Sequence, residues 1–511
     1  MTFSVLYPEP TPDPPSGSTA PDFFVDLNLD QIVEAVVKEK DEYALLPFFY
    51  APLESVTAIA YRHDVFRDLE RPGLLRCVRD LGEALAAMRK HLAFAAKIRH
   101  RHEANAWFLE AVDMYCSALT RFGEALSSEG PSSSAFRGLR VHLERYVASE
   151  SFRSLLAEKE HVHEALSQID YAIVIRDAEF TVRKYTGEPD YSAEVDETFA
   201  KFKQGAAKDY RVSFKRDFPD MNHIEQQVLT FVAQVYPNEF EQLDTFCQRS
   251  RNYLDSTVAR FDREIQFYLA YAHYIAPLKS SGLQFCYPAM TEGSDKNIYD
   301  REAFDIALAR KLQLSDSKVV CNDFSLSEPE RLIVVTGPNQ GGKTTFARAF
   351  GQIHYLAALG CPVPGSEARL YLFDKLFTQF EREESIENLR GKLEDDLCRL
   401  RSTLAEATDR SILILNEIFN STTLADAVFL SKEIMERLSS CDTIGIWVTF
   451  IDELASFNDK TVSMVSTVVP ENPAQRTFKV IRRQADGLAY ALAIAEKHRV
   501  TYRALHERIR S

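Results

Sequence analysis

The chain of 511 residues is 45% apolar and 26% charged, the balance of an ordinary globular protein. At roughly 100–200 residues per domain, this length predicts two to four domains. The formal net charge of −15 argues against a general binder of polyanions, because phosphate contacts require Lys and Arg. Any contact with nucleic acid must therefore use a local basic patch.

The eight cysteines are spread along the chain without a C-x-x-C pair, which argues against a zinc site or a disulfide framework. Reduced thiols in a cytoplasmic protein are the prediction. Residues 1–10 lack a basic segment followed by an apolar run, so we expect no secretory signal. Apolar stretches such as residues 267–278 are too short to span a bilayer, so no membrane association is expected.

The N-terminal half is predicted to be a Pro/Ser-rich tail (residues 1–25) followed by helices over residues 26–277. The prolines of the tail cannot form a packed element. One apolar stripe with a 4-3-4-3-4 spacing predicts a long helix and consists of Leu74, Val78, Leu81, Leu85, Met88 and Leu92. Further helices are expected near residues 155–180, 190–210 and 222–275, which makes this half all-α.

Residues 278–297 are rich in Ser, Gly and Pro and mark a domain boundary. Beyond it, apolar runs at 331–336, 411–415 and 443–449 read as buried strands that alternate with helices. Such alternation predicts a mostly parallel sheet with helices on both faces. Residues 278–511 are therefore expected to form an α/β domain.

A phosphate-binding motif follows the first of these strands. Its residues match G-x-x-x-x-G-K-[ST] without a mismatch and are Gly337, Pro338, Asn339, Gln340, Gly341, Gly342, Lys343 and Thr344, with Thr345 next in the chain. Glycines let backbone N–H groups turn onto phosphate oxygens, and the amphipathic helix expected at 345–359 adds its positive N-terminal end. Lys343 would reach the β and γ phosphates and the Thr344 hydroxyl would bind Mg²⁺. The motif predicts ATP and Mg²⁺ as cofactors; the alternative is a tight glycine turn without a ligand.

The residues around this motif resemble the MutS mismatch-repair family. Residues 336–345 resemble the family's T-G-P-N-x-x-G-K-S-T loop, and 411–423 (SILILNEIFNSTT) resemble its acidic pair and following Thr-Ser. Residues 446–454 (IWVTFIDEL), 486–490 and 493–500 resemble its next strand and C-terminal helices. This resemblance covers about residues 300–511 and implies a P-loop ATPase domain of the ABC type with C-terminal helices.

A weaker resemblance extends upstream, where residues 48–69 look like the start of the MutS core, or lever, domain. It implies lever helices with a clamp-like insertion near residues 155–265. Only the tail precedes this segment, so the mismatch-recognition and connector domains of MutS are expected to be absent. Two F-x-E strings, at 108–110 and 122–124, fall within helical pattern and are interpreted as chance matches.

The strand at 411–415 leads into Asn416 and Glu417, where the family has Asp-Glu. Asn416 can hydrogen-bond a metal-bound water but brings no charge. By the resemblance, Thr344, Asn416 and Glu417 form the metal site, and Glu417 and Lys343 are the catalytic residues, with Glu417 as general base. The alternative for Glu417 is a solvated carboxylate at a strand end.

Two further departures lie at Phe450 and at residues 391–397. Phe450 replaces a His that senses the γ-phosphate, and Phe donates no hydrogen bond. Residues 391–397 (GKLEDDL) replace the Ser/Thr-rich segment that completes the partner's site in MutS, although Arg390 or Lys392 could meet a phosphate across a homodimer. The alternative is an amphipathic helix with Ile386, Leu389, Leu393, Leu397, Leu400 and Leu404 on one face. These changes predict a weak ATPase with slow hydrolysis.

Two basic clusters are candidate contacts to the DNA backbone. The first consists of Lys97, Arg99, His100, Arg101 and His102. The second consists of Lys201, Lys203, Lys208, Arg211, Lys215 and Arg216, interleaved with Phe199, Phe202, Tyr210 and Phe214, and lies where the family has its clamp. The second is the preferred contact; the alternative for both is a solvated helix face.

Two functions follow from these observations. The first is a dimeric, DNA-binding, MutS-related ATPase that uses nucleotide binding to gate a clamp. The second is a nucleotide-gated scaffold that holds a protein partner without binding DNA. A transporter-type ATPase subunit fits less well, because the short Ser-Gly-Gly segment of such subunits is missing.

Overall fold

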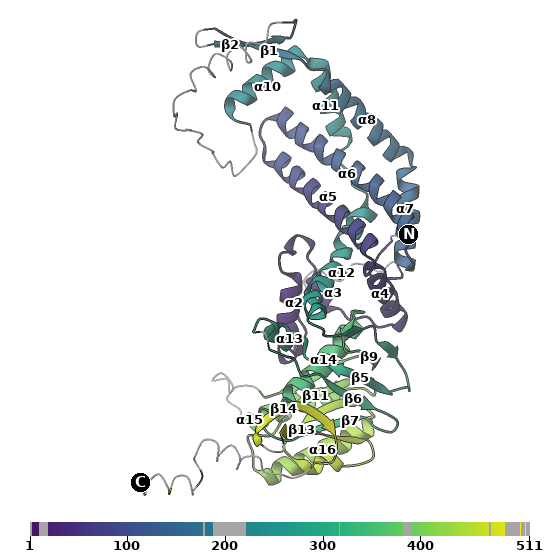
Figure 1. The fold of residues 1–511 in the computed structure, drawn as a ribbon, viewed down its shortest axis with the longest axis vertical. Coiled ribbons are helices and arrows are strands. Elements are labelled where there is room, and N and C mark those ends of the chain that lie inside the picture. Colours follow the sequence, from purple (N-terminus) through teal and green to yellow (C-terminus); the bar gives the residue numbers. More distant parts are fainter. Residues whose placement is uncertain are drawn as a thin grey trace. The chain divides into compact units, whose positions relative to one another are not determined.

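The computed structural model describes residues 3–9, 19–176, 179–187, 221–315, 317–381, 391–469, 472–485, 501 and 506. Its contacts divide the chain into two units (Figure 1). The sheet unit contains residues 1–67, 133–135 and 263–511, and the helical unit contains residues 68–132 and 136–262. The expected boundary near residue 277 is therefore wrong in one respect: residues 26–67 pack with the C-terminal part of the chain.

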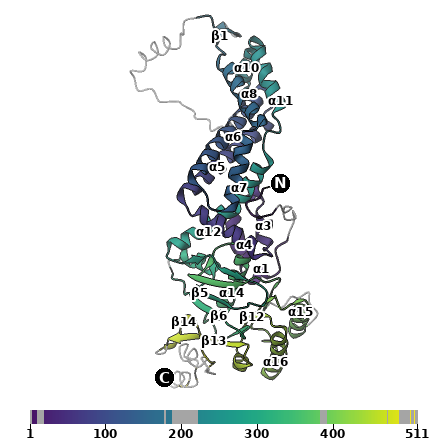
Figure 2. The same cartoon turned by 90° about the vertical axis from the view of Figure 1, so that its right-hand side faces the viewer.

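The helical unit is built from long helices that run side by side (Figures 1 and 2). They are α5 (Pro72–Lys97), α6 (Arg101–Glu129), α7 (Ser134–Val147), α8 (Glu150–Ser167), α10 (His223–Val235) and α11 (Pro237–Arg249). The apolar stripe of α5 is buried from Leu74 to Met88, and Leu92 is half-buried. Both F-x-E strings lie within α6, as their helical pattern predicted.

The helical unit also contains a hairpin, so the all-α prediction is wrong. Strand β1 (Tyr171–Arg176) pairs antiparallel with β2 (Glu179–Lys184), and Ile173 lies opposite Val182. The helix expected near 155–180 ends at Ser167 instead. The segment YAIVIR is rich in β-branched and aromatic residues, which suit a pleated strand better than a helix. The helix expected near 190–210 lies outside the described residues.

A six-stranded sheet forms the centre of the sheet unit, in the order β10-β11-β12-β7-β13-β14. The strands are β7 (Leu332–Thr336), β10 (Leu376–Phe380), β11 (Ile412–Asn416), β12 (Ile444–Val448), β13 (Thr461–Val469) and β14 (Asn472–Arg482). All neighbours are parallel except β13 and β14. The three buried strands read from the sequence are β7, β11 and β12, and every residue in them is buried, as expected for a sheet covered on both faces.

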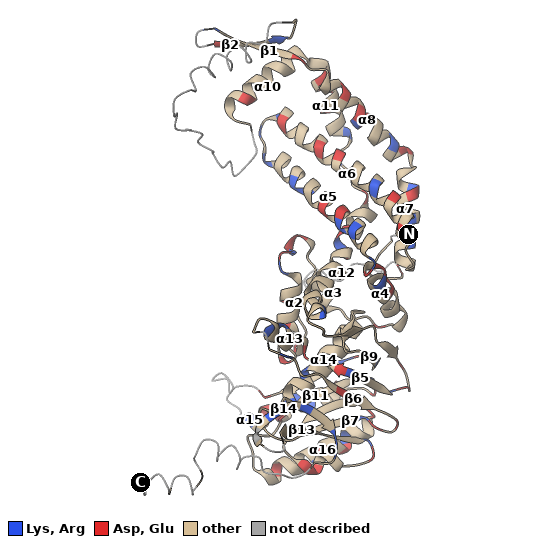
Figure 3. Cartoon of the chain, in the orientation of Figure 1, with Lys and Arg blue, Asp and Glu red and all other residues tan. Residues whose placement is uncertain are grey.

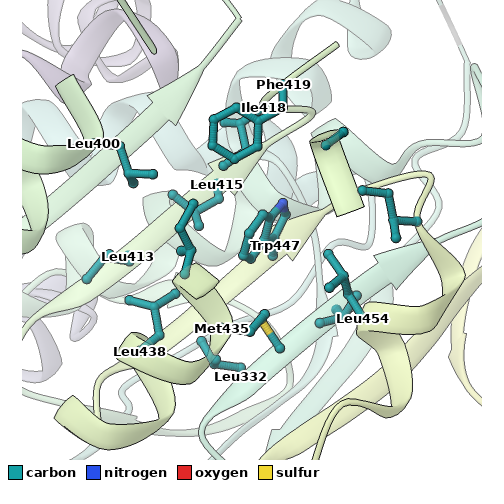
Figure 4. Packing of buried hydrophobic residues seen from close by; sticks show 14 of the residues in the cluster. Leu332, Leu400, Leu413, Leu415, Ile418, Phe419, Met435, Leu438, Trp447 and Leu454 are labelled. Carbon is teal, nitrogen blue, oxygen red and sulfur yellow. The ribbon is translucent and has the colours of Figure 1, made fainter. Parts of the chain in front are cut away.

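One face of this sheet packs against α16 (Leu424–Cys441) and α15 (Lys392–Glu406). Figure 4 shows Trp447 at the centre of this cluster, between Leu415 of β11 and Met435 of α16. Strand residues one position along, such as Ile414, face the opposite side, toward Gly351 of α14 (Lys343–Ala358). This alternation explains why the strands are apolar throughout.

Helix α14 is buried on all sides from Phe346 onward, apart from Arg348, and is not the amphipathic helix expected from the sequence. Short N-terminal elements cover it: the Arg348 Nε donates to Asp26 O at 2.9 Å, and Tyr355 OH donates to Phe49 O at 2.8 Å. These elements are α1 (Phe23–Asp26), α2 (Leu29–Val37), η1 (Asp41–Tyr43), α3 (Leu46–Tyr50) and α4 (Val56–Leu69). Helix α12 (Ser256–Ser280) contributes residues to both units.

The predicted tail at residues 1–25 is wrong where the structure describes it. Val5 and Leu6 are fully buried, and the Glu264 carboxylate accepts hydrogen bonds from Ser4 Oγ and Val5 N, both at 2.8 Å. Residues 10–18, which contain most of the prolines, lie outside the described residues.

A second, four-stranded sheet has the order β4-β9-β5-β6. Its strands are β4 (Ala289–Thr291), β5 (Ile298–Ala303), β6 (Asn322–Leu326) and β9 (Glu367–Tyr371), with α13 (Ile306–Gln313) between β5 and β6 in the sequence. The short strands β3 (Phe285–Cys286) and β8 (Val363–Pro364) pair beside it, and η2 (Asp452–Ser456) follows β12. No helix in the described part of the chain is long and apolar enough to cross a membrane.

Candidate nucleotide site

The glycine-rich loop connects the end of the central strand β7 to the first residue of α14. Gly337 and Gly342 adopt φ of 115° and 90°, a region that side chains rarely enter. A Cβ on Gly341 would lie 2.1 Å from Ser466 Oγ, and Ser466 donates to the Gly341 carbonyl at 2.7 Å. Strand β13 thus holds the loop so closely that only glycine fits there.

Lys343 is the first residue of α14, and its side chain is only 4% exposed. Its ammonium donates to Gly337 O at 3.0 Å, to Pro338 O at 3.2 Å and to Asn339 Oδ1 at 3.3 Å, and lies 3.7 Å from a Glu417 oxygen. Burial lowers the pKa of Lys343, while the neighbouring Glu417 carboxylate acts to raise it. A buried ammonium inside a glycine loop is suited to holding an anion.

Thr344, Asn416 and Glu417 meet at the carboxyl ends of the strands. Thr344 Oγ1 donates to Asn416 Oδ1 at 2.9 Å. Glu417 follows β11 with φ of 50°, and its N–H donates to Val448 O of β12 at 2.9 Å. Such a hydroxyl, amide and carboxylate set suits Mg²⁺, which binds one or two protein oxygens and completes its shell with waters and phosphate oxygens. The structure therefore brings together the three residues predicted to hold the metal.

A cavity of about 550 Å³ opens beside the loop. One wall consists of loop and helix residues 340–346 with Glu417. The other wall is largely apolar and includes Phe304, Leu308, Leu312, Val320 and Phe478. A polar phosphate end beside an apolar wall of this size fits a nucleotide. The sequence indicated the first wall but not the second. Its residues come from the β5–α13 connection, α13, β14 and the segment before β6, and they share no motif.

Phe450 follows β12 and is 49% exposed. Residues 392–406 form α15, and Leu393, Leu397, Leu400 and Leu404 pack on the core cluster, so the amphipathic-helix alternative is confirmed for the described part. Lys392 forms an ion pair with Glu381. Ile386, Leu389 and Arg390 lie outside the described residues.

The first basic cluster serves the helical unit itself. Arg101 forms an ion pair with Asp244 at 2.5 Å, and His100 caps α6 by accepting the Glu103 N–H. Figure 3 shows Lys and Arg interspersed with Asp and Glu along these helices. The second cluster, residues 201–216 with its aromatic neighbours, lies outside the described residues. It stays a prediction from the sequence.

Residues 333–506, from β7 onward, match the family model of MutS domain V. The C-terminal part of this chain is MutS-like. It is 28% identical over 216 residues to the DNA mismatch repair protein MutS of Chlorobaculum tepidum, a match that covers 42% of this chain and 24% of the relative. The DNA mismatch repair protein MutS of Prochlorococcus marinus is 30% identical over 195 residues, or 37% of this chain and 21% of the relative.

The DNA mismatch repair protein MutS 2 of Halobacterium salinarum is 32% identical over 139 residues, or 27% of this chain and 16% of the relative. Each match covers a quarter or less of the relative's own length. The MutS likeness therefore applies to the C-terminal part of the chain, which contains the glycine loop. The segments 486–490 and 493–500 fall within the matched range but outside the described residues.

Proposed function

We propose that this protein is a MutS-related, DNA-binding ATP-binding protein that acts as a homodimer. In this proposal nucleotide binding gates a clamp formed by the helical unit, and hydrolysis is slow. The observation that carries it is the glycine loop closed by the buried Lys343 and joined to the Thr344–Asn416 hydrogen bond at 2.9 Å.

Each site residue has a defined role in the proposal. Residues 337–345 hold the phosphates through backbone N–H groups, with Lys343 as the charged ligand. Thr344 and Asn416 hold the metal directly or through water, and Mg²⁺, when bound, neutralises phosphate charge. Glu417 orients and deprotonates the attacking water. The apolar wall with Phe304 and Phe478 receives the base.

Slow turnover follows from Asn416 and Phe450. Asn416 supplies no negative charge to the metal, and Phe450 donates no hydrogen bond to a phosphate. Losing one electrostatic stabiliser commonly reduces kcat by about 10²–10³-fold. A protein with this site would change state mainly on binding and releasing nucleotide.

Titration calorimetry with ATP and Mg²⁺ tests the nucleotide part. The wild-type chain should bind ATP, and Lys343→Ala should weaken binding at least about a hundredfold, because it removes a buried charged ligand. Lys375→Ala is the matched control, since Lys375 is half-exposed and pairs with Glu406. Wild-type protein that takes up no ATP would refute the proposal.

The DNA part is tested by measuring DNA affinity with and without ATP at increasing salt. A clamp that contacts phosphates should lose affinity steeply as salt rises. Light scattering with and without ATP tests the homodimer. DNA binding absent in both nucleotide states would favour the second candidate, a nucleotide-gated protein scaffold, which the net charge of −15 and the internally paired Arg101 support. The cytoplasmic location stays a prediction from the sequence.

A further inference from the structure

Strand β14 carries an irregularity beside the phosphate loop. Ser466 of β13 pairs with Val480 of β14, and Val468 of β13 pairs with Arg476 of β14. Between these two pairs β13 advances by two residues and β14 by four, so β14 has two extra residues at this point. Phe478 lies inside the bulge with φ of 59°. Bulges re-aim side chains and are frequent next to active sites.

Asn322 of β6 fixes the shape of this bulge. Its amide nitrogen donates to Phe478 O at 3.2 Å, and its amide oxygen accepts from Val480 N at 2.8 Å. Phe478 also stands against Gly342, where a Cβ would lie 3.7 Å from the ring. The bulge therefore places residues of β14 against the phosphate loop.

Arg476 is the first residue of the bulge, and its side chain contacts the phosphate loop at Asn339. Its Nε donates to the Asn339 carbonyl at 3.2 Å, while Lys343 Nζ donates to the Asn339 side-chain oxygen at 3.3 Å. Two cations thus contact one residue of the loop.

Arg476 and Lys343 bring two positive charges to one loop, and both would attract the polyphosphate of a nucleotide bound there. A guanidinium offers several donors in a fixed plane, which suits phosphate oxygens. Asn339 is the third residue of the loop, three positions before Gly342, whereas Phe478 and the apolar side chains line the cavity.

We propose that Arg476 is a second cationic ligand of the terminal phosphate, supplied by the same chain from the β14 bulge. This inference rests on the proposed function and goes beyond it, because the glycine motif contains no arginine. Arg476 contributes where Phe450 offers no donor, and it makes the site prefer a triphosphate over a diphosphate.

The test is calorimetry of a non-hydrolysable ATP analogue and of ADP, each with Mg²⁺, on the full chain. Arg476→Gln should weaken binding of the analogue about tenfold or more and change ADP binding less than about threefold. Arg476→Lys should fall between wild type and Gln, because it keeps the charge but loses the planar fork. Arg482→Gln is the matched control: Arg482 lies on the same strand, pairs with Glu330, and should leave both affinities unchanged.

Equal losses for the analogue and ADP in both Arg476 variants, or no loss in either, would overturn the assignment of Arg476. A wild-type chain that binds neither nucleotide would instead refute the proposed function, and this inference with it. Thermal melting without nucleotide identifies a variant that is unfolded. If Arg476→Gln is unfolded, the milder Arg476→Lys variant is used, and the ratio of its affinities for the ATP analogue and for ADP tests the role of Arg476.

Discussion

Charged residues gather differently at the two ends of the strands in the six-stranded sheet. The end where the parallel strands finish is called the carboxyl edge, and the end where they begin is called the amino edge. At the carboxyl edge, Lys343 is held by loop carbonyls, and positive φ angles at Gln340 and Glu417 accompany it. At the amino edge, Asp442 accepts hydrogen bonds from Lys296 and Lys460, at 3.0 and 2.9 Å, and forms an ion pair with Arg331 at 3.0 Å. At the amino edge one carboxylate meets three cations, whereas at the carboxyl edge Lys343 and Glu417 lie 3.7 Å apart beside the glycine loop and a cavity.

This difference separates a structural cluster from a binding site. Lys296 and Arg331 are almost fully buried, and Asp442 ties together the segments that precede β5, β7 and β12. Burial acts to raise the pKa of Asp442, but hydrogen bonds from Lys460, Lys296 and Arg331 outweigh it and hold that pKa well below its usual value. Burial instead lowers the pKa of Lys343, although the neighbouring Glu417 carboxylate acts to raise it.

The largest expected effect is at the amino edge. Asp442→Asn should lower the free energy of unfolding by about 3 kcal/mol, because two buried cations lose their carboxylate. Denaturant unfolding measures this loss, and ATP affinity of the folded variant should stay within about twofold. Asp459→Asn changes an exposed carboxyl nearby and should cost less than about 0.5 kcal/mol. Equal stability of the Asp442 variant and wild type would remove the contrast between the edges.

Gly341→Ala should weaken ATP binding about a hundredfold, because the new Cβ would lie 2.1 Å from Ser466 Oγ and 2.9 Å from Pro338 O. Combining it with Ser466→Ala removes the nearer clash and should recover about tenfold of the affinity. Calorimetry of both single variants and the double variant measures this coupling. Additive losses would mean that β13 does not hold the loop.

Asn416→Asp should raise the rate of ATP hydrolysis about tenfold and lower the Mg²⁺ concentration needed for half-maximal rate. An aspartate can keep the hydrogen bond from Thr344 and adds a negative charge beside the metal. Steady-state phosphate release over a Mg²⁺ titration measures both. Asn420→Asp places the same charge at an exposed position nearby and should change neither.

The smallest effect is a pH dependence of the amino edge. Because the folded-state pKa of Asp442 is lowered, its stabilising contribution is complete above the unfolded value near 4 and is lost as pH falls further. The stability difference between wild type and Asp442→Asn should therefore be constant from about pH 7 to 5 and shrink toward pH 3. A stability difference that does not change with pH would contradict the view that the three cations stabilise the ionised form of Asp442.

The sequence alone predicted the features that are formed by residues adjacent in the chain. The runs at β7, β11 and β12 are apolar because both faces of the sheet are covered, and the glycine motif is contiguous, so both could be read directly. Contacts between distant residues could not be read. Ser4 and Val5 look like part of a tail, but Glu264, some 260 residues away, binds them. Phe478 and Arg476 face the loop only because of a bulge set by pairing with β13.

The buried N-terminal strap of residues 4–6 has a practical consequence for anyone handling this protein. The Arg62 guanidinium bridges its last carbonyl, at Leu6, to Leu359 at the end of the helix that starts with Lys343, with distances of 3.1 and 2.7 Å. An affinity tag or a proteolytic nick at the amino terminus therefore acts on the far end of the phosphate-loop helix.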